Sequence, residues 1–220
     1  MLTVELVNNN IPRLNLQDTV AKAMQLAADY KASHLPVVTG DQLLGLISEE
    51  DLLDAGNEKT TLEHLQNHFV NAYVHENAHF LTAVNTSTQF DTNIVPVVTE
   101  EKELLGVITS NELLKALGNF AGVSEMGGII VLEMERSQFA ISEISRIVES
   151  NDATILHLNT IVQPETGMLT VTLHLNKKEI ASVVATFERY EYDVIYFFGD
   201  ENFENEIHSN YRHLMNYLDI

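Results

Sequence analysis

Two groups of side chains in this sequence could support chemistry: a set of histidines and a repeated hydroxyl–carboxylate pair. His75, Glu76 and His79 follow the order H-E-x-x-H. On one helix, this spacing would place two imidazoles on the same face to bind zinc, with the glutamate as the base for a metal-bound water. His64 and His68 are also four residues apart. The histidines therefore raise the alternative of a zinc-binding protein or hydrolase.

The hydroxyl–carboxylate pairs lie in a stretch that occurs twice. Residues 35–55 read LPVVTGDQLLGLISEEDLLDA, and residues 95–117 read VPVVTEEKELLGVITSNELLKAL. The matched positions are Pro36 with Pro96, Gly45 with Gly106, Ser48 with Thr109 and Asp51 with Glu112. Two copies indicate a pseudo-twofold unit, because a solenoid needs about three repeats or more to bury its faces.

Each copy predicts the same elements in the order helix, strand, turn, strand, helix. In the first copy, residues 19–31 have apolar residues at helix spacing, with Asp18 as the predicted N-cap. LPVV and LLGLI predict two strands, and Ser48 is the expected cap of the second helix. Each hydroxyl–carboxylate pair thus lies at a helix start, where both side chains can face a ligand. The same spacing is also that of an ordinary capping box, so a purely structural role stays open.

The repeat also argues against the zinc hypothesis. By the spacing from Pro36 to Pro96, His75 aligns with Asn15 and His79 with Thr19, so H-E-x-x-H crosses a predicted junction between strand and helix. The chain has no cysteine and no nucleophile-elbow, P-loop or dinucleotide-binding glycine motif. We therefore predict that the protein is not an enzyme and has no catalytic residues, metal site or cofactor, and we interpret these histidines as exposed polar residues.

The second half of the chain predicts another domain. Residues 118–127 read as a linker, and residues 128–200 predict strand, helix, strand, strand, helix, strand, the order of a ferredoxin-like fold. The expected elements are strands at 128–135, 153–162, 168–175 and 193–199, a helix capped by Ser137 and a helix at 179–190. Residues 201–220 predict a C-terminal helix with apolar residues at helical spacing. Its apolar side is a candidate docking surface for a protein partner.

Composition limits the partners. The chain has 12 Lys and Arg against 32 Asp and Glu, a net charge of −20 that is spread through both halves. Such a field repels phosphate backbones and anionic lipid, so we expect neither nucleic-acid nor membrane binding. The sequence has no long apolar run and no basic, apolar N-terminal signal, so we expect a soluble, cytoplasmic protein.

The repeated pattern of an apolar residue with Pro-Val-Val, a turn, a glycine-centred strand and [ST]-x-x-[DE] resembles tandem CBS domains, the Bateman-type pair. Residues 1–60 and 61–117 would be the two modules, and residues 128–200 resemble an ACT domain. This layout is similar to that of acetoin-utilization regulatory proteins. The resemblance implies an α/β (α+β) fold, in which two βαββα-type modules pack as a pair and a ferredoxin-like βαββαβ domain follows.

The resemblance also implies a function, because CBS pairs commonly bind adenosine-containing ligands in two clefts. We expect a regulatory protein that senses AMP, ADP, ATP or S-adenosylmethionine and transmits the signal through a homodimer. The alternative is a ligand-free scaffold that docks on a partner. In the first cleft, the expected ligand-binding residues are Leu14, His34, Leu35, Pro36, Ile47, Ser48 and Asp51. In the second cleft they are Val74, Val95, Pro96, Ile108, Thr109 and Glu112.

The two copies differ where a ligand would bind. His34 occupies a position where nucleotide-binding modules often have a basic residue, whereas the second copy has Ile94. A neutral imidazole binds phosphate less well than a guanidinium, so we expect adenosine with few phosphates rather than ATP. The longer side chain of Glu112 would crowd a ribose or fold back onto the helix cap. We therefore expect the first cleft to bind the ligand better.

The ACT-like part departs from its family at one loop. The usual D-x-x-G turn after the first strand is replaced by residues 135–138, which read ERSQ. Without the glycine, the backbone cannot approach an amino-acid effector closely. We therefore expect this domain to dimerise the protein rather than to bind an effector.

Overall fold

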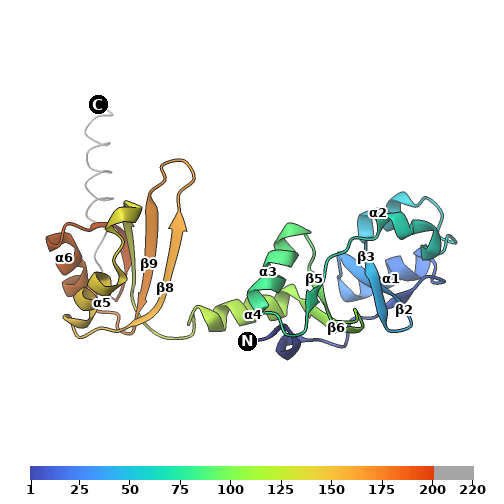
Figure 1. Ribbon diagram of the computed structural model, residues 1–220, viewed down its shortest axis with the longest axis horizontal. Helices are drawn as coiled ribbons and strands as arrows, with labels where there is room; N and C mark the ends of the chain where they lie inside the picture. The colour runs from blue at the N-terminus through green and yellow to red at the C-terminus, as the bar shows by residue number, and fades with distance from the viewer. Residues whose placement is uncertain (201–220) are drawn as a thin grey trace. The chain divides into compact units, whose positions relative to one another are not determined.

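The computed structural model of the protein describes residues 1–200 (Figure 1). The predicted C-terminal helix at residues 201–220 lies outside the described residues. The chain divides into two compact units, Met1–Leu117 and Gly118–Ile220. The predicted linker at residues 118–127 begins inside a helix, because the last helix of the first unit continues to Phe120.

The first unit contains two sheets of the same topology, as the repeat predicts. The first sheet has the order β1 (Leu14–Asn15), β2 (His34–Thr39) and β3 (Gln42–Ser48), and the second has β4 (Val74–His75), β5 (Ile94–Val98) and β6 (Leu104–Thr109). The helices are α1 (Val20–Tyr30), α2 (Glu49–Asp54), α3 (Phe80–Gln89) and α4 (Ser110–Phe120), with 3-10 turns η1 (Thr3–Leu6) and η2 (Leu62–His68). The N-cap of α1 is Thr19, not Asp18, because the Thr19 hydroxyl accepts the Lys22 backbone N–H.

The two modules meet around a pseudo-twofold axis. Ser33 and Asn93 occupy equivalent positions, and each donates its backbone N–H to the side-chain oxygen of the other, at 2.9 and 3.1 Å. Val38, Leu43 and Val98 form a small apolar cluster between the two sheets. The central strands β2 and β5 are almost wholly apolar and buried, which is the pattern of strands covered on both faces.

Each module is completed by the segment that leads into the other one. Residues 1–9, here called the N-terminal strap, pack on module 2, where Asn8 exchanges two backbone hydrogen bonds with Val107 of β6 (2.7 and 3.1 Å). Residues 60–70, the inter-module strap, pack on module 1, where Val70 exchanges two with Leu46 of β3 (2.8 and 2.9 Å). The predicted boundary at 60/61 therefore follows the sequence repeat, whereas the packing interleaves the two modules.

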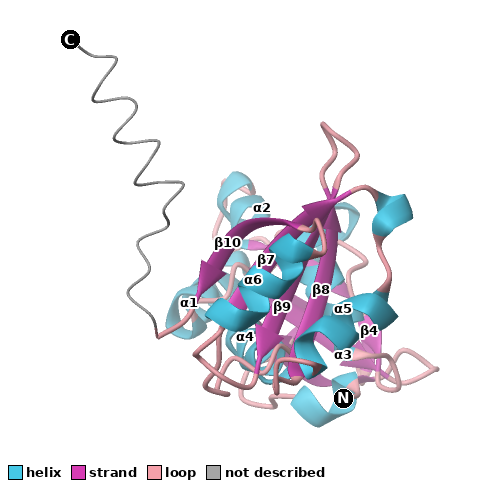
Figure 2. Cartoon of the chain, turned by 90° about the vertical axis from the view of Figure 1, so that its left-hand side faces the viewer, coloured by secondary structure: helices cyan, strands magenta, loops and turns pink. Residues whose placement is uncertain are grey.

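The second unit has a four-stranded antiparallel sheet of order β10-β7-β9-β8, covered by two helices on one face (Figure 2). Its elements are β7 (Ile129–Met134), α5 (Ile141–Glu149), β8 (Ile155–Val162), β9 (Leu169–Leu175), α6 (Ala181–Arg189) and β10 (Asp193–Phe198). This order and topology confirm the ferredoxin-like prediction. Ser137 does not cap a long helix: it lies in the 3-10 turn η3 (Arg136–Gln138), and α5 begins at Ile141.

Candidate ligand clefts of the paired modules

The carboxylate of Asp51 lies at the start of α2, where two side chains hold it. Ser48 caps the helix by accepting the Asp51 backbone N–H at 3.0 Å, and its hydroxyl donates to Asp51 Oδ2 at 2.5 Å. His68 Nδ1, from the inter-module strap, lies 3.0 Å from Asp51 Oδ1. Both oxygens of the predicted ribose-binding carboxylate therefore have a partner, and one partner comes from outside the repeat motif.

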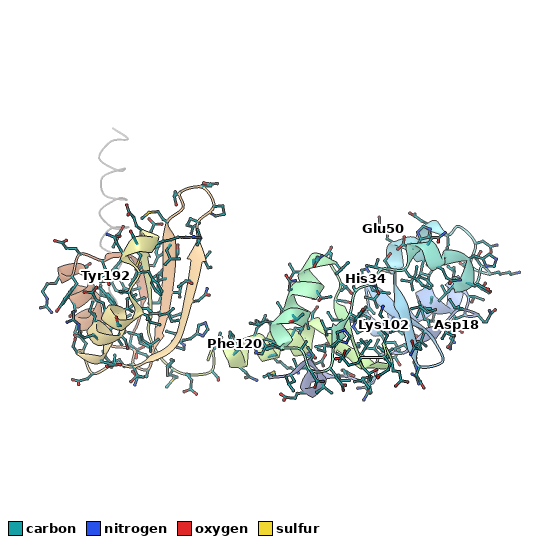
Figure 3. The ribbon with its side chains drawn as sticks, in the orientation of Figure 1. Asp18, His34, Glu50, Lys102, Phe120 and Tyr192 are labelled. Atoms are coloured by element: carbon teal, nitrogen blue, oxygen red, sulfur yellow. The ribbon has the colours of Figure 1, made fainter. Side chains whose placement is uncertain are left out.

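Electrostatics leave this cleft with an acceptor and a neutral imidazole. Burial alone would raise the pKa of Asp51, but the hydrogen bonds from Ser48 and His68 outweigh it and lower that pKa. Burial lowers the pKa of His34, although Asp51 and Asp91 oppose the shift. Figure 3 shows His34 where the two modules meet. Near neutral pH, Asp51 is thus ionised and accepts hydrogen bonds, whereas His34 is uncharged.

In the second module, Glu112 folds back onto the start of its own helix. Its Oε2 accepts the Thr109 backbone N–H at 2.9 Å and the Thr109 hydroxyl, which is the reciprocal geometry of a capping box. Asn8 Nδ2, from the N-terminal strap, donates to Glu112 Oε1 at 3.2 Å. Burial would raise the pKa of Glu112, but these hydrogen bonds lower it. Folding back is one of the two outcomes expected for the longer side chain.

The apolar residues predicted to line an adenine slot are core residues in this structure. They are fully or almost fully buried in both modules: Leu14, Leu35, Pro36, Ile47, Val74, Val95, Pro96 and Ile108. All of them except the two prolines belong to the apolar core clusters of the two modules. The sequence pattern could not separate the two roles, because a central strand buried on both faces and an apolar ligand wall have the same composition. Contact between these residues and a ligand remains a prediction.

A pocket of about 510 Å³ lies between the segment before β1 and strand β6. An exposed ion pair between Arg13 and Asp41, at 2.9 Å, borders it. Its other lining residues are Asn9, Ile11, Pro12, Leu104, Leu105, Gly106 and Val107. Sequence reasoning missed this pocket, since none of the predicted ligand residues lines it. The glycine that both copies share was the sequence feature that could have indicated this pocket. An added Cβ at Gly106 would lie 2.5 Å from Asn9 Oδ1, so the N-terminal strap can approach β6 this closely only at a glycine.

The zinc hypothesis fails on geometry. His75 lies on strand β4, and His79 is the N-cap of α3, so the two imidazoles do not share one helix face. Within residues 1–200, no three or more His, Cys, Asp or Glu side chains are grouped so that they could hold a metal ion. Within the same residues, no helix is both long enough and apolar enough to cross a membrane.

The family model of the CBS domain matches this chain twice, at residues 4–58 and 68–119. The chain therefore contains a CBS domain pair. Proteins with CBS pairs are typically regulatory ligand sensors rather than enzymes. The two matches cover both hydroxyl–carboxylate pairs and residues 4–9 of the N-terminal strap, whereas most of the inter-module strap falls in the gap between them. No curated protein sequence matches the chain.

Solved structures with similar folds include a CBS domain pair/ACT domain protein from Thermotoga maritima. That protein is 23% identical, the match covers 55% of this chain and 98% of that chain, and the TM-score is 0.50. A protein assigned to acetoin utilization, from Vibrio cholerae, is 21% identical over 57% of this chain and 98% of that chain, with a TM-score of 0.47. A CBS pair in complex with 5′-methylthioadenosine and S-adenosyl-L-methionine is 19% identical. The match covers 55% of this chain and 98% of that chain, with a TM-score of 0.45. The predicted CBS pair is confirmed by the family model, and the ferredoxin-like sheet of the second unit is the fold expected of an ACT-like domain.

Proposed function

We propose that this CBS pair binds an adenosine-containing metabolite and that the protein transmits the binding event as a homodimer. The observation that carries the proposal is the pair formed by Ser48 and the ionised Asp51 at the start of α2. A ribose presents two neighbouring hydroxyls, and an ionised carboxylate accepts hydrogen bonds from both of them more strongly than a neutral group would. The Ser48 hydroxyl donates to Asp51 Oδ2 and accepts the Asp51 backbone N–H, so one lone pair of its oxygen remains as an acceptor beside the carboxylate.

The first cleft is the better candidate because its carboxylate is easier to free. The side chain of His68, which holds Asp51 Oδ1, is 52% exposed. Glu112 is held more locally, since both the backbone N–H and the hydroxyl of Thr109 donate to it. A ligand can therefore replace one partner of Asp51 without opening a helix cap.

The proposed ligand carries few phosphates. His34 occupies the position at which a basic residue is expected to meet the phosphate, and burial, which lowers its pKa, keeps it uncharged near neutral pH. An uncharged imidazole donates one hydrogen bond and does not offset the charge of a triphosphate. AMP or S-adenosylmethionine thus suits this cleft better than ATP.

The homodimer is assigned to the open face of the ferredoxin-like sheet. α5 and α6 cover the other face, whereas Ile129, Tyr196 and Phe198 are 37, 47 and 60% exposed. Phe198 of β10 pairs with Ile129 of β7. Tyr196 lies two residues before Phe198 on β10, so the three side chains form one patch. A patch of this kind suits a second copy of the same sheet, because a twofold interface uses the same surface on both chains.

Isothermal titration calorimetry with AMP, ADP, ATP and S-adenosylmethionine tests the ligand proposal. We expect heat of binding for the wild type and at least about tenfold weaker binding for Asp51→Ala, because charge-assisted hydrogen bonds are worth about 1.5–3 kcal/mol. Asp54→Ala is the matched control, since Asp54 is an exposed acid on the same helix. Absence of heat for the wild type with all four ligands at millimolar concentration would falsify the proposal.

A further inference from the structure

The contact between His68 and Asp51 joins a segment of one module to the predicted ligand residue of the other. His68 is the last residue of η2, and the strap around it is anchored on β3 by the two backbone hydrogen bonds between Val70 and Leu46. The Phe69 N–H donates to the Gln66 carbonyl at 3.2 Å, which closes the turn that presents the imidazole. The strap, and not α2, therefore positions His68 over the carboxylate.

The second module repeats this arrangement with a different residue. Asn8 belongs to the N-terminal strap, pairs with Val107 of β6 through its backbone and donates its side-chain amide to Glu112 at 3.2 Å. In both modules, a polar side chain from the lead-in segment of the opposite module thus holds the acidic residue at the helix start. The two straps are not copies in sequence, so the shared feature is the contact itself.

We propose that His68 is a specificity-determining residue of the first cleft, which competes with the ligand for Asp51 Oδ1. This inference rests on the proposed function, because it concerns the same carboxylate. A ribose that uses both oxygens of Asp51 meets the imidazole at Oδ1, where the Nδ1–Oδ1 distance is 3.0 Å, and competes with it for that oxygen. A ligand that uses only Oδ2 leaves the contact in place and loses one hydrogen bond. Because only a ligand that uses both oxygens meets this competition, His68 lowers the preference of the cleft for ligands with two adjacent hydroxyls.

Displacement of His68 would also affect the second module, because the strap that carries His68 continues directly into it. Val74, the first residue of β4, comes six residues after His68, and the anchoring residue Val70 lies between them. Because the half-exposed imidazole holds Asp51 Oδ1 through a single contact, the competition is weak and reversible. A ligand can release it at small cost and loosen the segment that enters module 2.

Calorimetry of His68→Ala with AMP as the probe tests the competition. We expect AMP to bind this variant about threefold to tenfold more tightly than the wild type, because the competing donor is gone. A structural role of His68 would instead leave the affinity unchanged or weaken it. His64→Ala is the matched control, since His64 lies on the same turn and contacts Thr61 rather than Asp51. 2′-Deoxyadenosine monophosphate lacks the adjacent hydroxyls. We expect the His68→Ala substitution to raise the affinity for this ligand less than it raises the affinity for AMP.

The outcomes separate this inference from the proposed function. Equal or weaker binding by His68→Ala, with binding by the wild type, overturns the competition and leaves the adenosine proposal standing. AMP binding only by His68→Ala supports the competition, and the proposed function then depends on heat of binding to the wild type from ADP, ATP or S-adenosylmethionine. Absence of AMP binding by both proteins overturns both. His68→Ser serves as a second variant, and the thermal unfolding midpoint of each variant shows whether it is folded.

Discussion

At the scale of residues, one methylene group distinguishes the acids of the two candidate clefts, Asp51 and Glu112. Both copies place a hydroxyl and an acid three residues apart at a helix start. The shorter Asp51 cannot reach back to the backbone N–H of Ser48, so one oxygen is left for His68 of the strap. The longer Glu112 reaches the N–H of Thr109 and completes a capping box. The difference in side-chain length thus changes one site from a candidate ligand contact into a helix cap.

His34 makes stability depend on pH in mildly acidic solution. Burial lowers its pKa in the folded protein below the value near 6.5 of an unfolded chain, so the unfolded state binds the proton more readily. The stability associated with neutral His34 is present above about pH 6.5 and is lost as the pH falls through the folded-state pKa. We expect His34→Gln to reduce the loss of unfolding free energy between about pH 7.5 and 5.5.

Urea unfolding at several pH values measures this effect. His64→Gln, at an exposed histidine, is the control and should keep the pH dependence of the wild type. If His34→Gln and the wild type lose the same unfolding free energy over this range, the burial of His34 does not control the dependence.

At the scale of elements, the two straps make the modules interdependent. Thr3 is fully buried in module 2, and its hydroxyl lies 2.6 Å from the carbonyl oxygen of His75 and 2.9 Å from that of Glu76. The backbone of Thr60 accepts the Val20 N–H at the start of α1 in module 1. Without the strap that precedes the opposite module, each module would therefore lose some of its hydrogen bonds.

Close approach of the N-terminal strap to β6 predicts a cost for a side chain at Gly106. Its φ is +154°, and an added Cβ would meet Asn9 Oδ1 at 2.5 Å and Val7 Cγ1 at 2.6 Å. We expect Gly106→Ala to lower the unfolding free energy by about 1–3 kcal/mol and to speed hydrogen exchange at Asn8 and Val107.

Gly118→Ala is the matched control for this substitution. Gly118 lies inside α4, and an added Cβ there would meet nothing within 4 Å. We expect this change to stabilise the protein by about 0.5–1 kcal/mol, because alanine favours a helix more than glycine does. If the Gly106→Ala variant unfolds at the same urea concentration as the wild type, the N-terminal strap can move away from β6 without a loss of unfolding free energy.

At the scale of the whole molecule, the two units have different proposed tasks. The CBS pair has the two candidate ligand sites, whereas the ferredoxin-like unit has a sheet face with exposed large apolar side chains. The ACT-like loop at residues 135–138 forms a 3-10 turn with its own capping box between Glu135 and Gln138. Glu135 and Gln138 therefore satisfy each other's hydrogen-bonding groups.

The proposed dimer predicts a change of mass on substitution at the sheet face. One chain has a mass of 24.7 kDa, and we expect the wild type to sediment with twice that mass. Tyr196→Glu places a carboxylate in the patch on both chains, so we expect monomers, because a buried unpaired charge is costly. Tyr30→Glu is the control, since Tyr30 is similarly exposed but lies in the CBS unit. A wild type that sediments as a monomer, or a Tyr196→Glu variant that stays dimeric, contradicts the assignment.

The sequence by itself determined the duplicated module, the order of strands and helices, the ferredoxin-like second domain and the caps Ser48 and Thr109. These features depend on local periodicity and on turn and cap chemistry, which neighbouring residues carry. Only the tertiary structure decided that the predicted adenine-slot residues, such as Leu35 and Ile108, are core residues, and that His68 and Asn8 hold the two acids. These contacts join residues 17 and 104 positions apart in the chain. No local pattern encodes a pairing between a strap and the opposite module, because it arises only when the two copies pack around their shared axis.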